Sequence, residues 1–391
     1  MARRIAIVTV GRSDYSILQS VWRSLNQAGA DAGFVVAAGH LSPQQGMTED
    51  VIKADGLPIF GRVHCTLASD TPDAIATSIG LATLGFARAI PDAAPDAVVL
   101  LGDRYETMAA AVAVSALPIP IAHIHGGEVT EGAVDERYRH AITKLSHLHF
   151  ASTPGAAARL RQLGEEPWRI HVSGAPGIDG LLAAPRMPAP EAFAALDLEY
   201  FGPYLLVTLH PETVGDRTLE MADALAAALE RLDLPAVITG SNADAGGQAI
   251  NARMQALCAS NPQLQFVTSC GPRLYPSILA SALAVVGNSS SGLIEAPAFG
   301  KPVVNIGERQ TGRERSPHVL DCGYAADQIL SIVRAAISDG IRQSLVCEPS
   351  LYGDGAASSR IADVLTGAVF DETMLRKRFL DLAGAAASVQ D

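Results

Sequence analysis

Acidic and imidazole side chains follow several short apolar runs of the sequence, at the points where each run gives way to a helix-like segment. Asp103 follows the apolar residues 97–101, and His125 and Glu128 follow residues 119–124. In open α/β sheets ligands bind beyond the carboxyl ends of the strands, so Asp103 and Glu128 are candidates for general acid–base chemistry. A helix cap is the commoner role of a lone Asp in this position, and it stays an alternative for Asp103.

The pair His123 and His125 could bind a metal ion, because alternate residues of a strand point to the same side. The rest of a ligand set does not stand at matching positions, so we predict neither a metal nor a cofactor. Gly126 and Gly127 follow at once and indicate that the backbone approaches a ligand closely. Glu128 lies beyond the glycines and has the reach for acid–base work.

A helix-like segment begins at Asp135, where the helix dipole favours an acidic side chain. Asp135 and Arg139 are four residues apart, which is the spacing of an ordinary ion pair on a helix surface. The functional alternative is that Asp135 is a further carboxylate of the site and that Arg139 binds phosphate. The spacing alone leaves both possibilities open.

Polar side chains again follow apolar runs in the second half of the sequence. His210 follows residues 204–209, and the glycine-rich loop 240–247, which contains Asn242, follows the next run. A single His in such a position is usually structural, so His210 is weak evidence of a site by itself.

The segment 287–296, Gly-Asn-Ser-Ser-Ser-Gly-Leu-Ile-Glu-Ala, is the most informative in the chain. The hydroxyls of Ser289 and Ser290, together with amide N–H groups at the start of a helix, can form a cradle for a diphosphate. Glu295 lies about one helical turn later, where a carboxylate can accept both ribose hydroxyls of a nucleotide. Helix capping by the serines is the alternative.

Cations stand at the ends of other apolar runs. Arg12 follows Gly11 after the first run, and Arg309 and Arg313 follow residues 303–306. Guanidinium groups make charge-assisted bonds to phosphate, so all three arginines are candidates for diphosphate binding. Neither a dinucleotide fingerprint nor a Walker A loop accompanies Arg12.

The elements that must position these residues alternate between short apolar runs and longer segments rich in Ala and Leu. This alternation is typical of an α/β protein with a mostly parallel sheet. We predict two series of buried strands, at residues 4–10, 33–38, 97–101, 119–124, 148–151 and 170–173, and at residues 204–209, 236–239, 265–268, 284–286 and 303–306.

Between the two series, the prolines within residues 181–190 would interrupt a helix or a central strand and indicate a linker. We therefore expect two doubly wound, Rossmann-like domains that face a cleft. Residues 1–180 would carry the acid–base groups, and residues 191–368 would bind the nucleotide. The terminal segment 369–391, helical over residues 372–386, would pack back on the first domain.

Composition excludes several classes of function. The 391 residues carry 41 acidic and 29 basic side chains, a net charge of −12, so the chain lacks the basic footprint of a nucleic-acid-binding protein. Its 5 cysteines are scattered without a Cys-x-x-Cys pair, so neither a disulfide framework nor a zinc knuckle is indicated. No stretch approaches about 18 uninterrupted apolar residues, and we expect a soluble cytoplasmic protein without a membrane span.

Together these segments resemble the hydrolysing UDP-N-acetylglucosamine 2-epimerases of sialic acid biosynthesis. The resemblance runs in order through both halves of the chain and implies two Rossmann domains in a glycosyltransferase-B-type architecture. It rests on Gly-Arg-Ser-Asp-Tyr at 11–15, Leu-Gly-Asp-Arg-Tyr-Glu at 101–106, His-Ile-His-Gly-Gly-Glu at 123–128, Asp-Glu at 135–136 with Arg-His-Ala-Ile-Thr-Lys at 139–144, His-Pro-Glu-Thr at 210–213, Gly-Ser-Asn-Ala-Asp at 240–244, Gly-Asn-Ser-Ser-Ser-Gly-Leu-Ile-Glu at 287–295 and Asn-Ile-Gly-Glu-Arg-Gln at 305–310.

The resemblance implies a reaction in which the C2 proton of the sugar is removed, UDP is expelled, and the resulting 2-acetamidoglucal is hydrated to N-acetylmannosamine. It implies that Asp103, Glu128 and Asp135 are the acid–base groups, with Asp103 ranked above Glu128 and Glu128 above Asp135. His210, ranked with Asp103, would approach the diphosphate or the leaving oxygen. Contacts to UDP are implied for Arg12, Arg139, Asn242, Ser289, Ser290, Glu295, Arg309 and Arg313.

Position 125 differs within this group of enzymes. Related epimerases, including the animal hydrolysing enzymes, carry Glu there, whereas the bacterial enzymes of the sialic acid pathway share His125. The resemblance therefore makes His125 a substrate contact that also shares in the role of the base.

Other functions stay open at this point. A sister group of enzymes hydrolyses UDP-N,N'-diacetylbacillosamine on the way to legionaminic acid and shares nearly all of these motifs. A glycosyltransferase would have the same fold with an acceptor site in place of water, and a catalytically silent sensor would bind UDP without turnover. We expect a UDP-sugar substrate, no nucleic-acid or membrane partner, and a homodimer or homotetramer.

Overall fold

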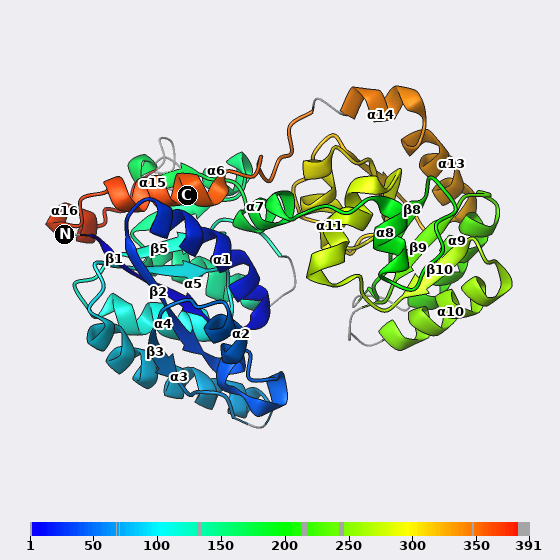
Figure 1. Ribbon diagram of the computed structural model, residues 1–391. Coiled ribbons are helices and arrows are strands. Elements are labelled where there is room, and N and C mark those ends of the chain that lie inside the picture. Colours follow the sequence, from blue (N-terminus) through cyan, green and yellow to red (C-terminus); the bar gives the residue numbers. More distant parts are fainter. Residues whose placement is uncertain are drawn as a thin grey trace, which may run out of the picture. The chain divides into compact units, whose positions relative to one another are not determined.

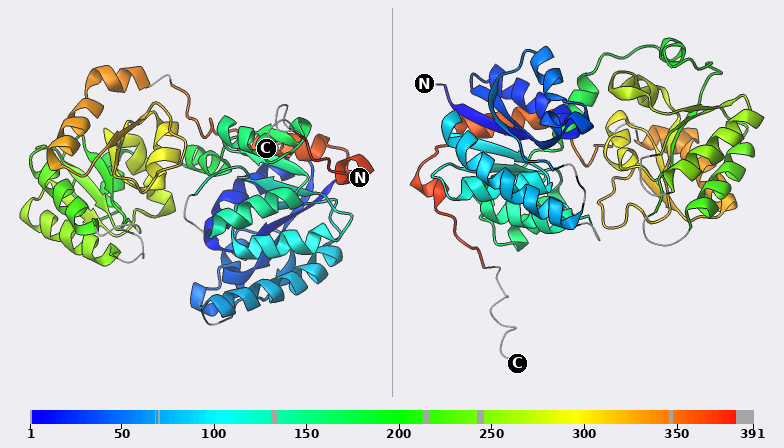
Figure 2. Two further views of the ribbon diagram at one scale, coloured as in Figure 1. Left: turned by 180° about the vertical axis from the view of Figure 1, so that it is seen from behind. Right: turned by 90° about the horizontal axis from the view of Figure 1, so that it is seen from below.

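The structure, a computed structural model of the chain, describes residues 2–67, 69, 71–130, 134–212, 217–241, 246–345 and 348–381. The chain forms two compact units (Figure 1): unit 1 is Met1–Gly180 with Gly355–Asp391, and unit 2 is Leu181–Asp354. Each unit has a parallel sheet with helices on both of its faces (Figure 2). The predicted fold class, two doubly wound α/β units, is confirmed.

The sheet of unit 1 has seven parallel strands in the order β3-β2-β1-β4-β5-β6-β7. They are β1 (Arg4–Thr9), β2 (Asp31–Ala37), β3 (Ile59–Val63), β4 (Ala97–Leu101), β5 (Ile121–Ile124), β6 (Leu148–Ala151) and β7 (Ile170–Val172). The chain runs outward on one side of β1 and then crosses to β4 on the other side. This reversal between β1 and β4 is the switch point at which open α/β sheets bind ligands.

Helices cover both faces of this sheet, and alternate residues of β1 supply two separate cores. The helices used below are α1 (Arg12–Gln27), α3 (Pro72–Ala93), α4 (Tyr105–Ser115), α5 (Asp135–Leu145), α6 (Pro154–Gln162) and α15 (Ala357–Gly367). Ile5 and Ile7 pack with α1 and α15, whereas Ala6 and Val8 pack with α3 and α4. Burial on both faces requires an apolar residue at every position, which explains the continuous apolar run of β1.

Unit 2 repeats this plan with six parallel strands in the order β10-β9-β8-β11-β12-β13. The strands are β8 (Leu205–Thr208), β9 (Ala236–Thr239), β10 (Leu264–Val267), β11 (Ala284–Gly287), β12 (Val303–Ile306) and β13 (Val319–Cys322). Helices α9 (Thr218–Glu230), α10 (Gly247–Ser260) and α13 (Ala326–Ala336) pack on one face, and α8 (Ala189–Ala194) and α11 (Gly271–Ser281) pack on the other.

The sequence analysis missed β3 and β13, each of which lies at one edge of its sheet, whereas β7 and β10 at the opposite edges were predicted. In each of them only the last residue is fully buried, and Arg62 and Asp321 interrupt the apolar pattern. The signal used for the other strands is a continuous buried run. β3 and β13 do not produce it, because a charged side chain interrupts each of them.

The chain returns to unit 1 earlier than the predicted boundary at residue 369. Helix α15 packs beside α1, and its residues Ile361 and Leu365 are fully buried in the core of unit 1 (Figure 1). The Asp179 carboxylate accepts hydrogen bonds from the amide of Ala357 at 3.1 Å and from that of Ser358 at 2.5 Å. A carboxylate from unit 1 thus satisfies the start of α15.

The terminal segment is anchored by Arg169, whose side chain is fully buried. Its guanidinium donates to three main-chain oxygens of that segment, those of Thr373, Met374 and Arg376. Helix α16 (Glu372–Leu375) is therefore short, and the predicted helix is wrong over residues 376–381. Arg169 binds carbonyl oxygens that a longer helix would use for its own hydrogen bonds. Residues 382–386 of the prediction lie outside the described residues.

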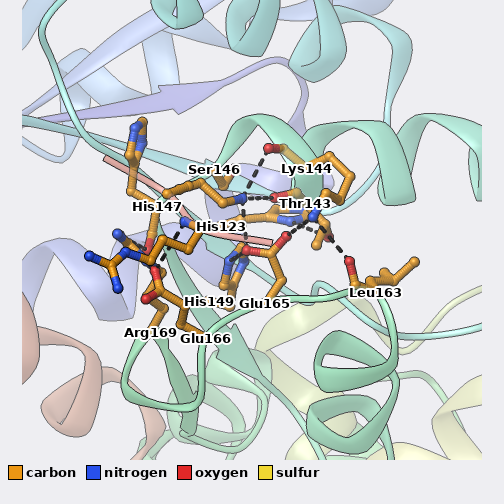
Figure 3. A network of polar contacts seen from close by, with 12 residues as sticks. His123, Thr143, Lys144, Ser146, His147, His149, Leu163, Glu165, Glu166 and Arg169 are labelled. Carbon is orange, nitrogen blue, oxygen red and sulfur yellow. Dashed lines mark hydrogen bonds and ion pairs between the residues drawn. The ribbon is translucent and has the colours of Figure 1, made fainter. Parts of the chain in front are cut away.

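The same network ties the terminal segment to α5 (Figure 3). Lys377 Nζ donates to the main-chain oxygen of Lys144 at 3.0 Å, close to the C-terminal end of α5, and lies 2.7 Å from a carboxylate oxygen of Glu165. The fully buried Glu165 also contacts His149 Nε2 at 2.8 Å. Burial opposes ionisation of Glu165, but the bonds from His149 and the lysines outweigh it and hold the pKa at about 2.

Replacing Arg169 by Met should lower the free energy of unfolding by about 3 kcal/mol, because the terminal segment loses bonds to a charged group and Glu166 loses its ion pair. Urea unfolding checks this value. Arg376→Met is the matched control, since the exposed pair of Arg376 with Glu372 should contribute little. Equal unfolding midpoints for the two variants would contradict the anchoring role of Arg169.

Helix α3 is the one helix within the described residues that is long and apolar enough to cross a membrane, judged by length and composition alone. Its residues Ala82, Phe86 and Ile90 are fully buried in the second core of unit 1. Core helices pass the same test, so the apolar composition is accounted for in part by this packing.

Candidate active site

Unit 1 places its predicted site residues at the carboxyl ends of three adjacent strands. β1 leads into Gly11 and Arg12, β4 leads into Gly102 and Asp103, and β5 leads into His125. Parallel neighbours have their carboxyl ends at one edge of the sheet, so these residues share that edge.

Arg139, on α5, holds Asp103. Its side chain is 7% exposed and pairs with the Asp103 carboxylate, which comes from a residue 36 positions away. Arg139 also donates to Thr130 Oγ1 at 3.2 Å and to Glu136 at 3.4 Å. The ion pair with Asp135 that the spacing allowed is not formed among the described contacts. Arg139 is therefore bound to a carboxylate of the protein, and its contact with phosphate stays a prediction.

Asp135 begins α5, and its side chain is exposed. Desolvation by neighbouring atoms and the negative charge of Asp103 raise the pKa of Asp135, against the guanidinium groups of Arg104 and Arg139. A carboxyl group that keeps its proton to a higher pH is a better general acid. Asp135 thus suits proton donation more than proton removal.

His125 is oriented by Glu128. His125 Nδ1 lies 2.5 Å from Glu128 Oε1, and Ser152 Oγ donates to the same oxygen at 2.5 Å. His125 Nε2 is buried and has no hydrogen-bond partner within the described part of the chain. The backbone of His125 is left-handed, with φ at 67°. Such strained conformations of residues other than Gly occur often at functional sites.

The charge of Glu128 fixes the proton on the imidazole. Burial favours the protonated form of Glu128, but the His125 ring and the bonds from His125 and Ser152 outweigh burial and hold the pKa at about 2. An ionised carboxylate only accepts hydrogen bonds, so Nδ1 of His125 must donate. Nε2 is then the basic nitrogen, which is the arrangement of a general base with an orienting carboxylate.

His123 is a structural residue and not half of a metal pair. Its ring is fully buried, with Nε2 2.7 Å from the main-chain oxygen of Gly102 and Nδ1 3.2 Å from Thr143 Oγ1. Burial lowers the pKa of His123 to about 3, against the bond to Gly102, and keeps the ring neutral. Because Gly102 precedes Asp103, His123 fixes the turn that presents Asp103.

Gly126 and Gly127 serve packing inside unit 1, whereas the sequence analysis predicted close approach to a ligand. Gly127 has φ at 78°, and a Cβ there would lie 2.2 Å from the main-chain oxygen of Ala156. A Cβ on Gly126 would lie 3.0 Å from His123 Nδ1 and from Thr143 Oγ1. The two glycines let the loop after β5 pack against α6 and the His123 ring.

The start of α1 suits an anion. Arg12 is exposed and makes no side-chain hydrogen bond or ion pair in the described regions, and a Cβ on Gly11 would meet no atom within 4 Å.

Two further polar residues lie close to this place. Burial raises the pKa of Asp14, and the positive charge of Arg104 opposes this shift. Arg104 itself makes two bonds of 3.2 Å to Glu106. The sequence analysis did not select Asp14 and Arg104, although both lie close behind strand ends.

In unit 2, Asn288 fixes the backbone of His210. The amide of His210 donates to Asn288 Oδ1 at 2.7 Å, and Asn288 Nδ2 donates to the main-chain oxygen of His210 at 2.9 Å. His210 Nδ1 lies 3.4 Å from Ser241 Oγ. Asn288 is fully buried and follows Gly287, where φ is 135° and a Cβ would lie 1.8 Å from the main-chain oxygen of Thr208. This role of Asn288 was missed, since the partners are 78 positions apart.

The serines after β11 form the start of α12 (Ser290–Ile294). Ser289 caps this helix and accepts a 3.4 Å hydrogen bond from the amide of Ser291. Ser291 Oγ donates to the Glu295 carboxylate and also bonds the hydroxyl of Tyr275. Burial raises the pKa of Glu295, and the bond from Ser291 opposes this shift. Ser291, which the sequence analysis did not select, thus orients the carboxylate expected to bind ribose.

Glu212 shapes the loop that carries Arg309. Its Oε1 accepts from the amides of Glu308 at 2.8 Å and Arg309 at 3.1 Å, and its Oε2 accepts from the Tyr324 hydroxyl at 2.8 Å. Arg309 Nη1 lies 3.4 Å from the main-chain oxygen of Asn288, so this loop lies beside the serine segment.

The other predicted residues of unit 2 are less constrained. Ser290 lies in the first turn of α12, and Arg313 is half-buried, without a side-chain ion pair among the described residues. Asn242 lies outside the described residues. The roles of the predicted site residues in both units remain predictions.

Comparison with known proteins shows the family. The family model described as UDP-N-acetylglucosamine 2-epimerase matches residues 23–366. The UDP-N,N'-diacetylbacillosamine 2-epimerase (hydrolyzing) of Legionella pneumophila is 34% identical, over 96% of this chain and 99% of its own. The GDP/UDP-N,N'-diacetylbacillosamine 2-epimerase (hydrolyzing) of Campylobacter jejuni is 31% identical, over 97% and 99%. The UDP-N-acetylglucosamine 2-epimerase of Neisseria meningitidis is 27% identical, over 97% and 99%.

Solved structures share the fold. The UDP-GlcNAc 2-epimerase of Methanocaldococcus jannaschii matches with a TM-score of 0.74 at 18% identity, over 93% of this chain and 100% of that one. The Neisseria meningitidis enzyme bound to UDP-GlcNAc matches with a TM-score of 0.72 at 17% identity, over 93% and 100%. From the family match and the curated relatives, the chain belongs to the UDP-N-acetylglucosamine 2-epimerase family.

Proposed function

We propose that the protein is a hydrolysing 2-epimerase, which converts a UDP-linked 2-acetamido sugar and water into UDP and the free sugar inverted at C2. The observation that carries this proposal is the His125–Glu128 pair, a half-buried imidazole with one nitrogen held by an ionised carboxylate. Its second nitrogen has no partner in the described regions. Removal of a weakly acidic C2 proton needs a base of this kind.

Unit 1 supplies the proton transfers in this mechanism. His125 Nε2 takes the C2 proton, the electron pair of the C2–H bond forms a C1=C2 double bond, and the C1–O bond breaks with UDP as the leaving group. His125 then releases this proton to solvent. Water then adds its oxygen at C1, while Asp135 gives a proton to C2 and recovers one from the water. This assignment moves the base from Asp103 to His125, because the Asp103 charge is shared with Arg139.

Unit 2 supplies the nucleotide contacts. Ser289, Ser290 and the Arg309 guanidinium suit a diphosphate, and Glu295 suits the ribose hydroxyls. The half-buried position and the bond from Ser291 favour this role of Glu295, because they hold the carboxyl group in one place before the nucleotide binds.

For the sugar we propose N,N'-diacetylbacillosamine ahead of N-acetylglucosamine, which reverses the order suggested by the motifs. Two of the three relatives above 30% identity are named for this sugar and support the choice. The third, a polysialic acid biosynthesis protein of Escherichia coli at 32%, is not named for it, and the Neisseria relative at 27% supports N-acetylglucosamine as the second candidate. The two sugars differ at C4 and C6.

The test measures UDP release and free sugar from each UDP-sugar. We expect kcat/KM to be at least about 10-fold higher with the diacetylbacillosamine substrate, since the groups at C4 and C6 add contacts. A higher value for UDP-N-acetylglucosamine would reverse the order of the two candidates. UDP release that requires an added acceptor sugar would instead indicate a glycosyltransferase and contradict the hydrolysing function.

We further propose that the protein is a homodimer through α3 and α4. Leu84 and Leu81 of α3 are 68% and 41% exposed, and Val112 of α4, the helix that packs beside α3, is 40% exposed. Exposed apolar patches of this kind mark interaction surfaces.

Replacing Leu84 by Glu should therefore convert a dimer into a monomer, because the new charge would be buried in the interface. Light scattering during size-exclusion chromatography measures the mass. Val369→Glu is the matched control, since Val369 is also 68% exposed but follows α15. A monomeric wild type, or dissociation of both variants, would contradict this interface.

A further inference from the structure

A basic hollow lies in unit 2, away from the residues assigned to the nucleotide. It has a volume of about 480 Å³. Its lining comes from the predicted linker 181–190, α11, the loop before β12 and α14 (Asp339–Leu345). Leu283 of the lining precedes β11, and Pro302 precedes β12. The hollow thus lies at the amino ends of these strands, whereas Ser289 and Arg309 follow their carboxyl ends. Strands of this length separate the two places by about 13 Å.

Three cations and one carboxylate line the hollow: Arg186, Lys301, Arg342 and Asp339. The Asp339 carboxylate lies 3.8 Å from Arg342 and is 89% exposed, so it neutralises little of the charge. Lys301 Nζ makes no hydrogen bond or ion pair within the part of the chain that the structure describes. The lining therefore has an excess of positive charge, in a protein whose net charge is −12.

The position of Lys301 is unfavourable for a cation. Burial and the charge of Arg342 both lower the pKa of the Lys301 amine. Two like charges held together in a half-buried place destabilise a fold unless a counter-charge joins them. An anion with two negative charges would relieve this repulsion and make charge-assisted bonds to both side chains.

The remaining lining is apolar and favours an organic ligand. Leu182, Leu283 and Phe299 face the same hollow, and the Arg186 guanidinium lies 5.1 Å from the centre of the Phe299 ring. Small-molecule sites commonly combine such apolar walls with a few fixed charges, and their volumes begin at about 300 Å³.

We propose that this hollow binds a small organic phosphate, with Lys301 and Arg342 on the phosphate and the side chains of Leu182, Leu283 and Phe299 on the organic group. A phosphate monoester carries about two negative charges at neutral pH, which matches the two cations without a full counter-charge.

Calorimetric titration of the full-length protein with phenyl phosphate tests the proposal. Excess UDP is present throughout, so that the probe does not occupy the nucleotide site proposed above. We expect one probe molecule per chain, and about 10-fold weaker binding to Lys301→Gln and to Arg342→Gln. Arg253→Gln, which removes an exposed cation of α10 outside the hollow, should bind as the wild type does. Absence of binding to the wild type, or the same loss in all three variants, would overturn the site.

Two further measurements need no variant. Inorganic phosphate should bind several-fold more weakly than phenyl phosphate, and equal affinity would contradict the role of the apolar wall. Acetylation of lysine amines, followed by mass spectrometry of peptides, compares Lys301 with the exposed Lys53 in one molecule. Phenyl phosphate should slow acetylation of Lys301 several-fold and leave Lys53 unchanged. Equal effects on both lysines, or none, would overturn the proposal.

Discussion

Replacing His125 by Asn is expected to lower kcat for the UDP-sugar about 10³-fold, because the variant loses the base that removes the C2 proton. Asn suits this test since it tolerates the left-handed backbone of position 125 better than most residues do. KM should change little if His125 acts mainly in the transition state. Steady-state kinetics with a coupled assay for UDP measures both parameters.

His64→Asn is the matched control, because His64 is an exposed His of unit 1 that we place outside the site. Its kcat should stay within about twofold of the wild type, as expected for a surface substitution. A His125→Asn enzyme with wild-type turnover would remove His125 from the mechanism and return the role of the base to Asp103.

Replacing Asp103 by Asn should lower kcat about 10²-fold or more, because the Arg139 guanidinium, 7% exposed, would lose the charge that it holds. The pH dependence should change as well. The negative charge of Asp103 raises the pKa of Asp135, so its removal should lower that pKa. The mechanism uses protonated Asp135 as the acid, so the fall in activity on the alkaline side of the profile should begin at a lower pH in the variant. The basic limb of the kcat profile therefore shifts toward acid pH.

Rate profiles that extend below pH 3.8, the ordinary pKa of an Asp carboxyl, measure this shift, and Asp50→Asn, a change at an exposed position of α2 (Glu49–Ala54), controls for the loss of one charge. A loss of activity in Asp103→Asn with an unshifted basic limb would show that Asp103 does not act on Asp135. A shift toward alkaline pH would contradict the proposed direction of proton transfer.

Strand positions in the centres of both sheets could be predicted from the sequence because burial on two faces leaves a continuous apolar run. β4, β6, β9 and β12 begin and end at the predicted residues. Such a signal is local, and it is absent at β3 and β13, where Arg62 and Asp321 interrupt the apolar run.

Partners distant in sequence could not be predicted. The spacing of Asp135 and Arg139 is local and allows an ion pair, but tertiary packing brings Asp103 to the same guanidinium. Arg169 likewise ends α16 by taking carbonyl oxygens more than 200 positions away, a bond with no trace in the helical pattern of the terminal segment.

The candidate site was predicted as a set of residue types, and the structure supplies their pairing. His125 and Glu128 were selected separately, one as a contact and one as an acid–base group. Their 2.5 Å separation makes them one unit, in which the carboxylate orients the imidazole. A sequence cannot show this, because the pairing depends on the left-handed backbone at His125.

Running the reaction in deuterated water tests the central claim, which is removal of the C2 proton followed by elimination of UDP and hydration. Mass spectrometry and proton NMR of the free sugar measure the label. The mechanism predicts one deuterium at C2 of every product molecule and one UDP released for each sugar formed, without an added acceptor. A product that carries hydrogen at C2, with UDP released all the same, would contradict it.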